Sequence, residues 1–145
     1  MGDVMGGKKV HLQIFTPRGL KIEEKADMLV MRCIDGDMGV LPGHAAVSAA
    51  LGDGILRIIN NSRTEQKIAV FGGVAVVKDD LVRIMTTIAQ RPGEIDLPRA
   101  EADRRQAELL LQERSEDVKI QSYQVMLRRA LVRIEVSVYP QEDED

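Results

Sequence analysis

Basic side chains near the end of the chain are the residues best suited to bind another molecule. Arg128, Arg129 and Arg133, with Lys119 before them, make this segment basic, although the whole chain has a formal net charge of -3. Guanidinium and ammonium groups bind carboxylates and phosphates, but on most helices such charges are only solvated. The segment is therefore either a contact surface for an acidic partner or an ordinary solvated helix face.

Histidine and cysteine are too sparse to suggest a metal site or a nucleophile. His11 and His44 are the only histidines, and neither lies in a cluster with the spacing of metal ligands. Cys33 is the only cysteine, and its apolar neighbours indicate a small buried side chain. Walker A, G-x-S-x-G and H-E-x-x-H motifs are absent. We therefore expect no catalytic residue, no metal and no required cofactor, and we interpret His44 as a structural or interface residue.

The composition disfavours several classes of function. Apolar residues make up 44% of the 145 residues but aromatic residues only 3%, so the core must be aliphatic. The net charge and the acidic segment 141–145 argue against a protein that coats nucleic acid. No run of about 18 apolar residues occurs, and residues 1–9 contain no apolar stretch, so we expect neither membrane insertion nor secretion. The expected partners are proteins.

The elements that position these residues fall into two regions, of which the first is rich in β-branched residues. Short apolar runs alternate there with turns of glycine, asparagine and aspartate. This pattern predicts an all-β sandwich or flattened barrel over residues 8–91. Strands are expected at 10–14, 28–34, 55–59, 67–71, 74–77 and 81–88.

The second region begins where Arg91, Pro92 and Gly93 interrupt the strand pattern. Asp96 is placed as a helix N-cap, and apolar residues then recur at helical spacing. A polar turn at 115–117 precedes a second apolar stripe, so residues 92–139 are expected to form an antiparallel two-helix hairpin. Residues 1–7 and 140–145 are expected to be flexible termini.

The end of the second helix has two readings. Residues 132–138 alternate between apolar and polar side chains, which is typical of a strand. In a helix, Val132 and Val136 would instead lie opposite Ala130 and Leu131, giving a helix with two apolar faces. The pattern leaves a short helix with an extended end and a full-length helix equally open.

Five motifs, in order along the chain, resemble the epsilon subunit family of rotary ATP synthases, whose mitochondrial members are called delta. The most specific is the glycine-rich stretch 36–44, Gly-Asp-Met-Gly-Val-Leu-Pro-Gly-His, interpreted as a loop at one end of the sandwich. The resemblance covers the chain from position 10 to about 134. The other four motifs are Thr16-Pro17, Gly54-Ile55-Leu56-Arg57-Ile58, Phe71-Gly72-Gly73 and Ile95-Asp96-Leu97-Pro98-Arg99-Ala100.

The resemblance implies a non-catalytic central-stalk subunit at the cytoplasmic face of a membrane. In such a protein the sandwich docks on the gamma subunit and the rotor ring of c subunits, here through Asp37, Met38 and His44. The hairpin either lies on the sandwich or extends towards the catalytic beta and alpha subunits, where it blocks hydrolysis. The residues implied in the contact with beta are Lys119, Arg128, Arg129 and Arg133.

The resemblance also implies a regulatory ATP that is bound but not hydrolysed. The family motif for this site matches Asp96, Arg99, Arg129 and Arg133, and arginines one turn apart suit phosphate oxygens. This sequence departs from the ATP-binding members at three positions, Gln90, Pro98 and Gln106. The alternative reading has Asp96 as a helix cap and the arginines as partners of Glu101, Glu135 or a neighbouring subunit.

Two other functions compete with the family reading. One is an unrelated interaction adaptor built from a β-sandwich and a helical hairpin. The other is a small-molecule enzyme of the double-stranded β-helix type, whose metal normally takes several histidines and a carboxylate. Two separated histidines do not supply such a site.

Overall fold

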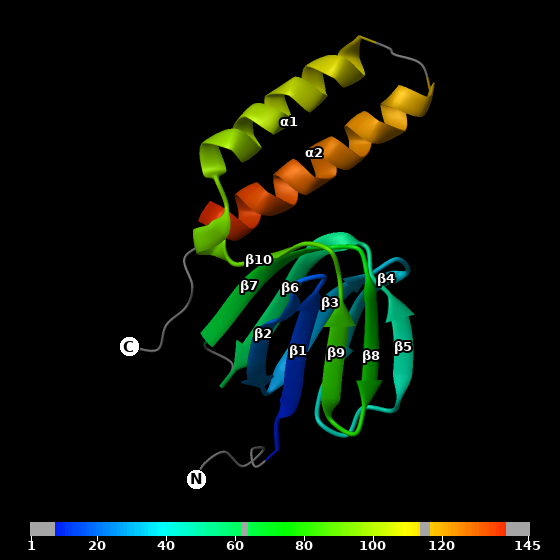
Figure 1. The fold of residues 1–145 in the computed structure, drawn as a ribbon, viewed down its shortest axis with the longest axis vertical. Helices are drawn as coiled ribbons and strands as arrows, with labels where there is room; N and C mark the ends of the chain where they lie inside the picture. Colours follow the sequence, from blue (N-terminus) through cyan, green and yellow to red (C-terminus); the bar gives the residue numbers. More distant parts are fainter. Residues whose placement is uncertain (1–7, 62–63, 114–116, 139–145) are drawn as a thin grey trace.

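The structure is a computed structural model that describes residues 8–61, 64–113 and 117–138 (Figure 1). An N-terminal body of strands is followed by a pair of helices. The strands are β1 Val10–Thr16, β2 Gly19–Ala26, β3 Met28–Cys33, β4 Gly36–Val40, β5 Val47–Ala50, β6 Asp53–Asn60, β7 Thr64–Phe71, β8 Val74–Lys78, β9 Leu81–Met85 and β10 Ala89–Gln90. A 3-10 turn, η1 Pro92–Glu94, leads into α1 Leu97–Gln112 and α2 Asp117–Val138.

The strands form two five-stranded sheets packed face to face. One sheet has the order β2-β1-β9-β8-β5 and the other β10-β7-β6-β3-β4. Adjacent strands pair antiparallel except β1 and β9, which are parallel. The expected β-sandwich followed by a helical hairpin is confirmed.

The core between the sheets is aliphatic because alternate residues of each strand point inward. In β1, Val10, Leu12 and Ile14 are fully buried, while the residues between them are partly exposed. Ile58, Ile68 and other strand residues meet them from the facing sheet. Burial of such side chains stabilises the sandwich by about 1.5–3 kcal/mol for each one.

Four of the observed strands were not predicted from the sequence. Half of the residues of β2 are charged and only Ile22 and Ala26 are buried, a pattern typical of an edge strand. β4 occupies residues 36–40, so the interpretation of the stretch 36–44 as a loop is wrong for its first five residues and holds for 41–44, which contain a turn. Its backbone is held by antiparallel pairing with β3, which a local turn pattern does not reveal. β5 and β10 are only four and two residues long.

The last expected strand, 81–88, is interrupted. β9 ends at Met85, and after three residues β10 pairs with β7 in the opposite sheet. The crossing is stabilised by Thr86, a buried polar residue whose Oγ1 lies 3.3 Å from the carbonyl oxygens of Phe71 and Ile88. The chain therefore changes sheets just before the hairpin begins.

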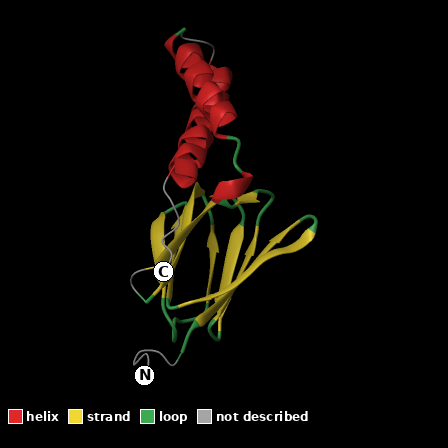
Figure 2. Cartoon of the chain, turned by 90° about the vertical axis from the view of Figure 1, so that its left-hand side faces the viewer, coloured by secondary structure: helices red, strands yellow, loops and turns green. Residues whose placement is uncertain are grey.

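The hairpin stands at one end of the sandwich, with α2 next to the strands and α1 beyond it (Figures 1 and 2). Asp96 Oδ1 accepts the Arg99 backbone N–H at 3.1 Å, which confirms the expected N-cap of α1. Ala100 and Ala107 are buried on α1, and Ala130 on α2. Small side chains at these positions let the two helices approach closely.

The helical reading of residues 132–138 is the correct one, because α2 runs to Val138. Val136 is fully buried in a small apolar cluster with Ala69 and Phe71 of β7, and Val132 packs against it. The helix therefore has one apolar face on the sandwich and another on α1. The free energy gained by burying the two valines exceeds the cost of placing a β-branched residue in a helix, which is below about 0.7 kcal/mol each.

Some expectations concern residues that the structure does not describe. The expected flexible termini, 1–7 and 140–145, lie outside the described residues, as do position 139 and most of the turn expected at 115–117. Within the described ranges, neither helix combines the length and apolar character needed to cross a membrane.

Candidate functional site

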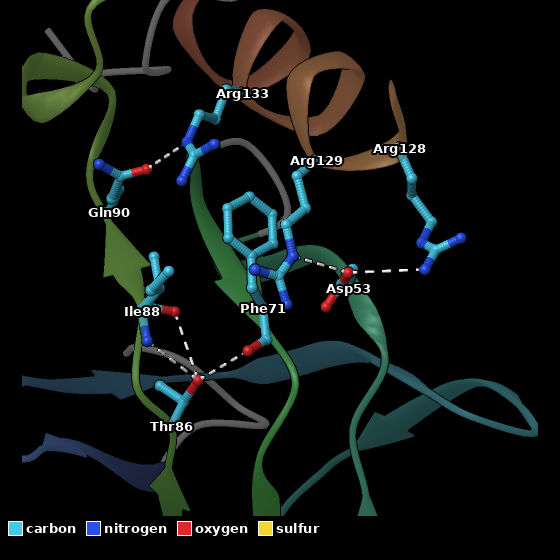
Figure 3. A network of polar contacts seen from close by, with 8 residues as sticks. All are labelled: Asp53, Phe71, Thr86, Ile88, Gln90, Arg128, Arg129 and Arg133. Carbon is cyan, nitrogen blue, oxygen red and sulfur yellow. Dashed lines mark hydrogen bonds and ion pairs between the residues drawn. The ribbon is translucent and has the colours of Figure 1, made fainter. Parts of the chain in front are cut away.

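Two arginines of α2, one helical turn apart, reach the end of the sandwich (Figure 3). Arg129 Nε donates to Asp53 Oδ2 at 2.9 Å, and Arg133 Nε donates to Gln90 Oε1 at 2.8 Å. Both side chains point the same way because residues at i and i+4 share a helix face. Their guanidinium carbons lie 5.1 Å and 4.7 Å from the centroid of the Phe71 ring. Each guanidinium thus has a polar partner and shares an aromatic one.

Asp53, the first residue of β6, is the acidic centre of this contact. Its side chain is only 9% exposed, and Arg128 Nη2 lies 3.7 Å from the oxygen that Arg129 contacts. A carboxylate with so little exposure needs a cationic partner, because burying an unpaired charge is costly. Arg129 supplies that partner, and Arg128, which is 52% exposed, adds a weaker interaction.

The backbone that carries Phe71 and Gln90 is fixed by Thr86. Its hydroxyl oxygen lies between the Phe71 and Ile88 carbonyls and also accepts the Ile88 N–H at 3.4 Å (Figure 3). Phe71, which both arginines contact, and Gln90, which Arg133 contacts, therefore come from one hydrogen-bonded corner, where β7 ends and the chain changes sheets.

A cleft of about 350 Å³ lies beside Arg133, between the start of α1 and the sandwich. Burial lowers the pKa of Arg133, and the positive charges of Arg129 and Arg99 lower it further, while Asp103 opposes them. Arginine remains charged at neutral pH despite such shifts. The cleft is lined by Gln90, Glu94, Asp96, Arg99, Ala100, Asp103 and Arg133.

The residues expected to bind ATP divide into two groups. Asp96, Arg99 and Arg133 all line the cleft, although Asp96 already caps α1. Arg129 instead points to Asp53 and is bonded there (Figure 3). Gln90, one of the departures from the ATP-binding members, receives the hydrogen bond of Arg133.

The residues expected to contact beta are not all equally accessible. Lys119 and Arg128 are exposed on α2, whereas Arg129 and Arg133 are half-buried against the sandwich. A partner that binds all four would have to draw the last two away from Asp53 and Gln90.

The three residues expected at the rotor ring lie along β4 and the segment after it. Asp37 Oδ1 accepts from Arg32 Nη1 at 3.1 Å, and both line a groove of about 510 Å³ that also includes Arg128. Met38 is half-buried against the core. His44 lies at the other end, where the preceding Gly43 N–H donates to Asp80 in the turn between β8 and β9. The structure therefore does not gather Asp37 and His44 at one end of the sandwich.

The cysteine and the two histidines contact neighbouring protein groups. Cys33 is buried, and burial raises the pKa of its thiol, with Asp35 and Asp37 adding to the effect. His11 Nε2 lies 2.7 Å from Glu23 Oε2, and His44 Nδ1 lies 2.7 Å from the Ala45 carbonyl oxygen. Across residues 8–61, 64–113 and 117–138, no three His, Cys, Asp or Glu side chains are grouped so that they could hold a metal ion.

Asp53 and Phe71 were not singled out as partners of the arginines by the sequence. Asp53 stands between Gly52 and Gly54 and reads as a turn residue. Its contact with Arg129 joins residues 76 positions apart, and no local pattern signals such a pairing.

Comparison with known proteins extends over almost the whole chain. Residues 9–92 match the family described as ATP synthase, Delta/Epsilon chain, beta-sandwich domain. Residues 94–137 match the family described as ATP synthase, Delta/Epsilon chain, long alpha-helix domain. The chain belongs to the ATP synthase delta/epsilon family. Its sandwich and its hairpin correspond, in that order, to the two domains of the family.

Curated relatives of the delta/epsilon family resemble the chain along most of its length. The ATP synthase epsilon chain of Bacillus velezensis is 36% identical over 130 residues, covering 90% of this chain and 98% of that one. The epsilon chain of Syntrophomonas wolfei is 32% identical over 129 residues, covering 89% and 94%. That of Pelotomaculum thermopropionicum is 40% identical over 104 residues, covering 72% and 77%.

A solved structure of a mitochondrial ATP synthase contains a chain with the same fold. A chain in the Euglena gracilis mitochondrial ATP synthase, a structure of OSCP, F1 and c-ring in rotational state 1, superposes with a TM-score of 0.74 at 25% identity. The alignment covers 96% of this chain and 89% of that one. Family membership decides against both alternatives, the unrelated adaptor and the double-stranded β-helix enzyme.

Proposed function

We propose that this chain is a non-catalytic subunit of the central stalk of an ion-translocating ATP synthase, at the cytoplasmic face of the membrane. Its sandwich couples the gamma subunit to the rotor ring for ATP synthesis, and its hairpin restrains ATP hydrolysis. The observation that carries the proposal is the match of both domains, in order, to the delta/epsilon family.

The sandwich is the part suited to permanent docking. It has a continuous aliphatic core, and its strands β4 and β5 form sheet edges that a partner can cover. We assign Asp37, Met38 and His44 to contacts with the ring of c subunits or with gamma. Because Asp37 and His44 lie at opposite ends of β4 and the following segment, we expect them to contact different subunits.

The hairpin is the part suited to movement. It rests on the sandwich through one helix and a small apolar cluster, so little apolar surface is exposed when it lifts. In the lifted position Lys119, Arg128, Arg129 and Arg133 are free to contact acidic surfaces of the beta and alpha subunits. Attraction between these charges would be weakened by salt.

Co-purification tests the assignment to the stalk. An affinity-tagged copy of the full chain, expressed in its own cells and recovered from detergent-solubilised membranes, should bring down alpha, beta, gamma and c subunits in fixed proportion. A tagged copy with Val10, Leu12 and Ile14 all replaced by Asp, which cannot form the core, is the control and should recover none. Recovery of the intact chain without gamma and c would refute the proposal.

The cleft beside Arg133 supports a second candidate function, weak binding of regulatory ATP without hydrolysis. Arg99 and Arg133 both line it and could bind phosphate oxygens, whereas Arg129 is bonded to Asp53. Calorimetric titration of the full chain with ATP should then give saturable heat that Arg99→Ala and Arg133→Ala abolish. The absence of saturable heat at millimolar ATP would remove this site.

A further inference from the structure

The contact between α2 and the sandwich has an unusual polar part. A small apolar cluster of strand residues lies under α2, and beside it the side chain of Asp53 is only 9% exposed, with its carboxylate bonded to Arg129. Burying a carboxylate costs free energy that is regained only while a cation stays beside it. The cation comes from the hairpin, so α2 both covers Asp53 and supplies the charge that pairs with it.

Phe71 makes the contact selective for arginine at two positions. Phe71 as a whole residue is 2% exposed, and its ring lies under the guanidinium groups of both Arg129 and Arg133. Two cations would normally repel each other across one helical turn. The negative face of an aromatic ring and the opposing carboxylate of Asp53 offset that repulsion. Lysine, which lacks the flat guanidinium, would not stack in the same way.

Gln90 completes the arrangement at the other end. Its side-chain oxygen accepts from Arg133, and its strand β10 leads directly into η1 and the hairpin. Three sandwich residues from β6, β7 and β10 thus hold two arginines of one helix.

We propose that Asp53, Phe71 and Gln90 form a clasp that holds the hairpin on the sandwich without bound nucleotide, by occupying Arg129 and Arg133. The clasp rests on the proposed function, in which the same arginines contact the catalytic subunits. Sandwich and catalytic head therefore compete for one pair of guanidinium groups. Opening the clasp both releases the hairpin and frees Arg129 and Arg133 to contact the catalytic subunits.

The position of the hairpin in the isolated full chain tests the clasp directly. Spin labels attached at Val74→Cys, where β8 begins three residues after Phe71, and at Gln124→Cys on α2, which lines the groove beside Asp53, report the distance between sandwich and hairpin by pulsed electron resonance in a Cys33→Ala background. Both labelled positions are exposed and lie outside the clasp. Without nucleotide we expect one short distance, matching the arrangement in Figure 1.

Substitutions in the clasp should move that distance. Asp53→Asn keeps the shape but removes the charge, and it should raise the ratio of long to short distances by about fivefold or more, as loss of a charge-assisted hydrogen bond implies. Arg129→Lys and Phe71→Leu should act in the same direction. Asp79→Asn, in the exposed turn between β8 and β9, is the matched control and should leave the ratio unchanged.

Two further arms keep the test decisive. Circular dichroism should show that each variant retains its helices and strands, and 1 M salt should raise the long-distance fraction of the unsubstituted chain. A short distance that appears only on adding ATP, or a ratio that is the same in Asp53→Asn and the parent, would overturn the clasp. These measurements need no other subunit, so their failure is distinct from a failure of the hairpin to restrain hydrolysis.

Discussion

At Gly73, between β7 and β8, both the backbone and the space around it exclude a side chain. Its φ is +114°, and a Cβ there would lie 2.2 Å from the Met85 carbonyl oxygen. Gly73→Ala should therefore destabilise the chain by about 2–3 kcal/mol, the upper part of the range of about 1–3 kcal/mol for a strained backbone position, because the added Cβ also meets the Met85 carbonyl oxygen. Thermal unfolding followed by circular dichroism would show a melting temperature lower by about 5–10 °C.

Gly93 provides the matched control for that substitution. A Cβ on Gly93 meets nothing within 4 Å, and its φ is not in the left-handed region. Gly93→Ala should leave the melting temperature nearly unchanged. Equal effects of the two substitutions would contradict the backbone geometry described for Gly73.

Asp27 should contribute to the acid sensitivity of the sandwich. The Asn61 backbone N–H, and then Lys9, hold the pKa of this carboxyl below its ordinary value. A carboxyl with a lowered folded-state pKa stabilises the fold above its unfolded-state pKa, and this stabilisation is lost as pH falls through both values. The loss should therefore occur below about pH 4.

Urea unfolding at pH 6 and pH 3 measures this contribution. The free energy of unfolding should fall more between the two pH values for the parent chain than for Asp27→Asn. Asp35→Asn, which removes a carboxyl at an exposed position, serves as the comparison and should behave like the parent. An identical pH dependence for Asp27→Asn and the parent would contradict the role given to Asn61.

At the scale of elements, the packing of α1 on α2 depends on alanine. Ala107 is fully buried, whereas Ala102 on the same helix is exposed. Ala107→Leu should force the helices apart and destabilise the hairpin by about 1–3 kcal/mol, the usual cost of overpacking. Hydrogen exchange should quicken in α1 and α2 while the strands keep their protection.

A substitution at the exposed Ala102 distinguishes an effect on helix packing from an effect on helix propensity. Ala102→Leu adds the same side chain to the same helix without entering the interface, so exchange in the hairpin should not change. Faster exchange in both variants, or in the strands as well, would show that the helices do not pack as described.

The sequence predicted elements well where their pattern was local and poorly where pairing was distant. Alternation in β1 and the cap at Asp96 are local signals, and both led to correct expectations. The glycines of β4 suggested a loop, but the segment is a strand because it pairs with β3, and this pairing has no signal in the local sequence. The arginines of α2 were recognised from their spacing, but Asp53 was not, because nothing near it in sequence indicates a partner 76 residues away.

At the scale of the whole molecule, the sandwich and the hairpin differ in how they are held together. The sandwich has a closed core, while the hairpin is attached by α2, the apolar cluster around Phe71 and the clasp. The chain changes from one to the other at η1, which follows directly after β10. Removing the hairpin should therefore leave the docking surfaces of the sandwich in place.

The most direct test compares ATP hydrolysis by synthase complexes rebuilt with the full chain and with a chain ending at Arg91. Both complexes should contain equal amounts of the subunit and make ATP when an ion gradient is supplied. With the shortened chain, we predict a rate of hydrolysis several-fold higher, since the part that restrains it is gone. An unchanged rate of hydrolysis in a fully assembled complex would contradict the regulatory role of the hairpin.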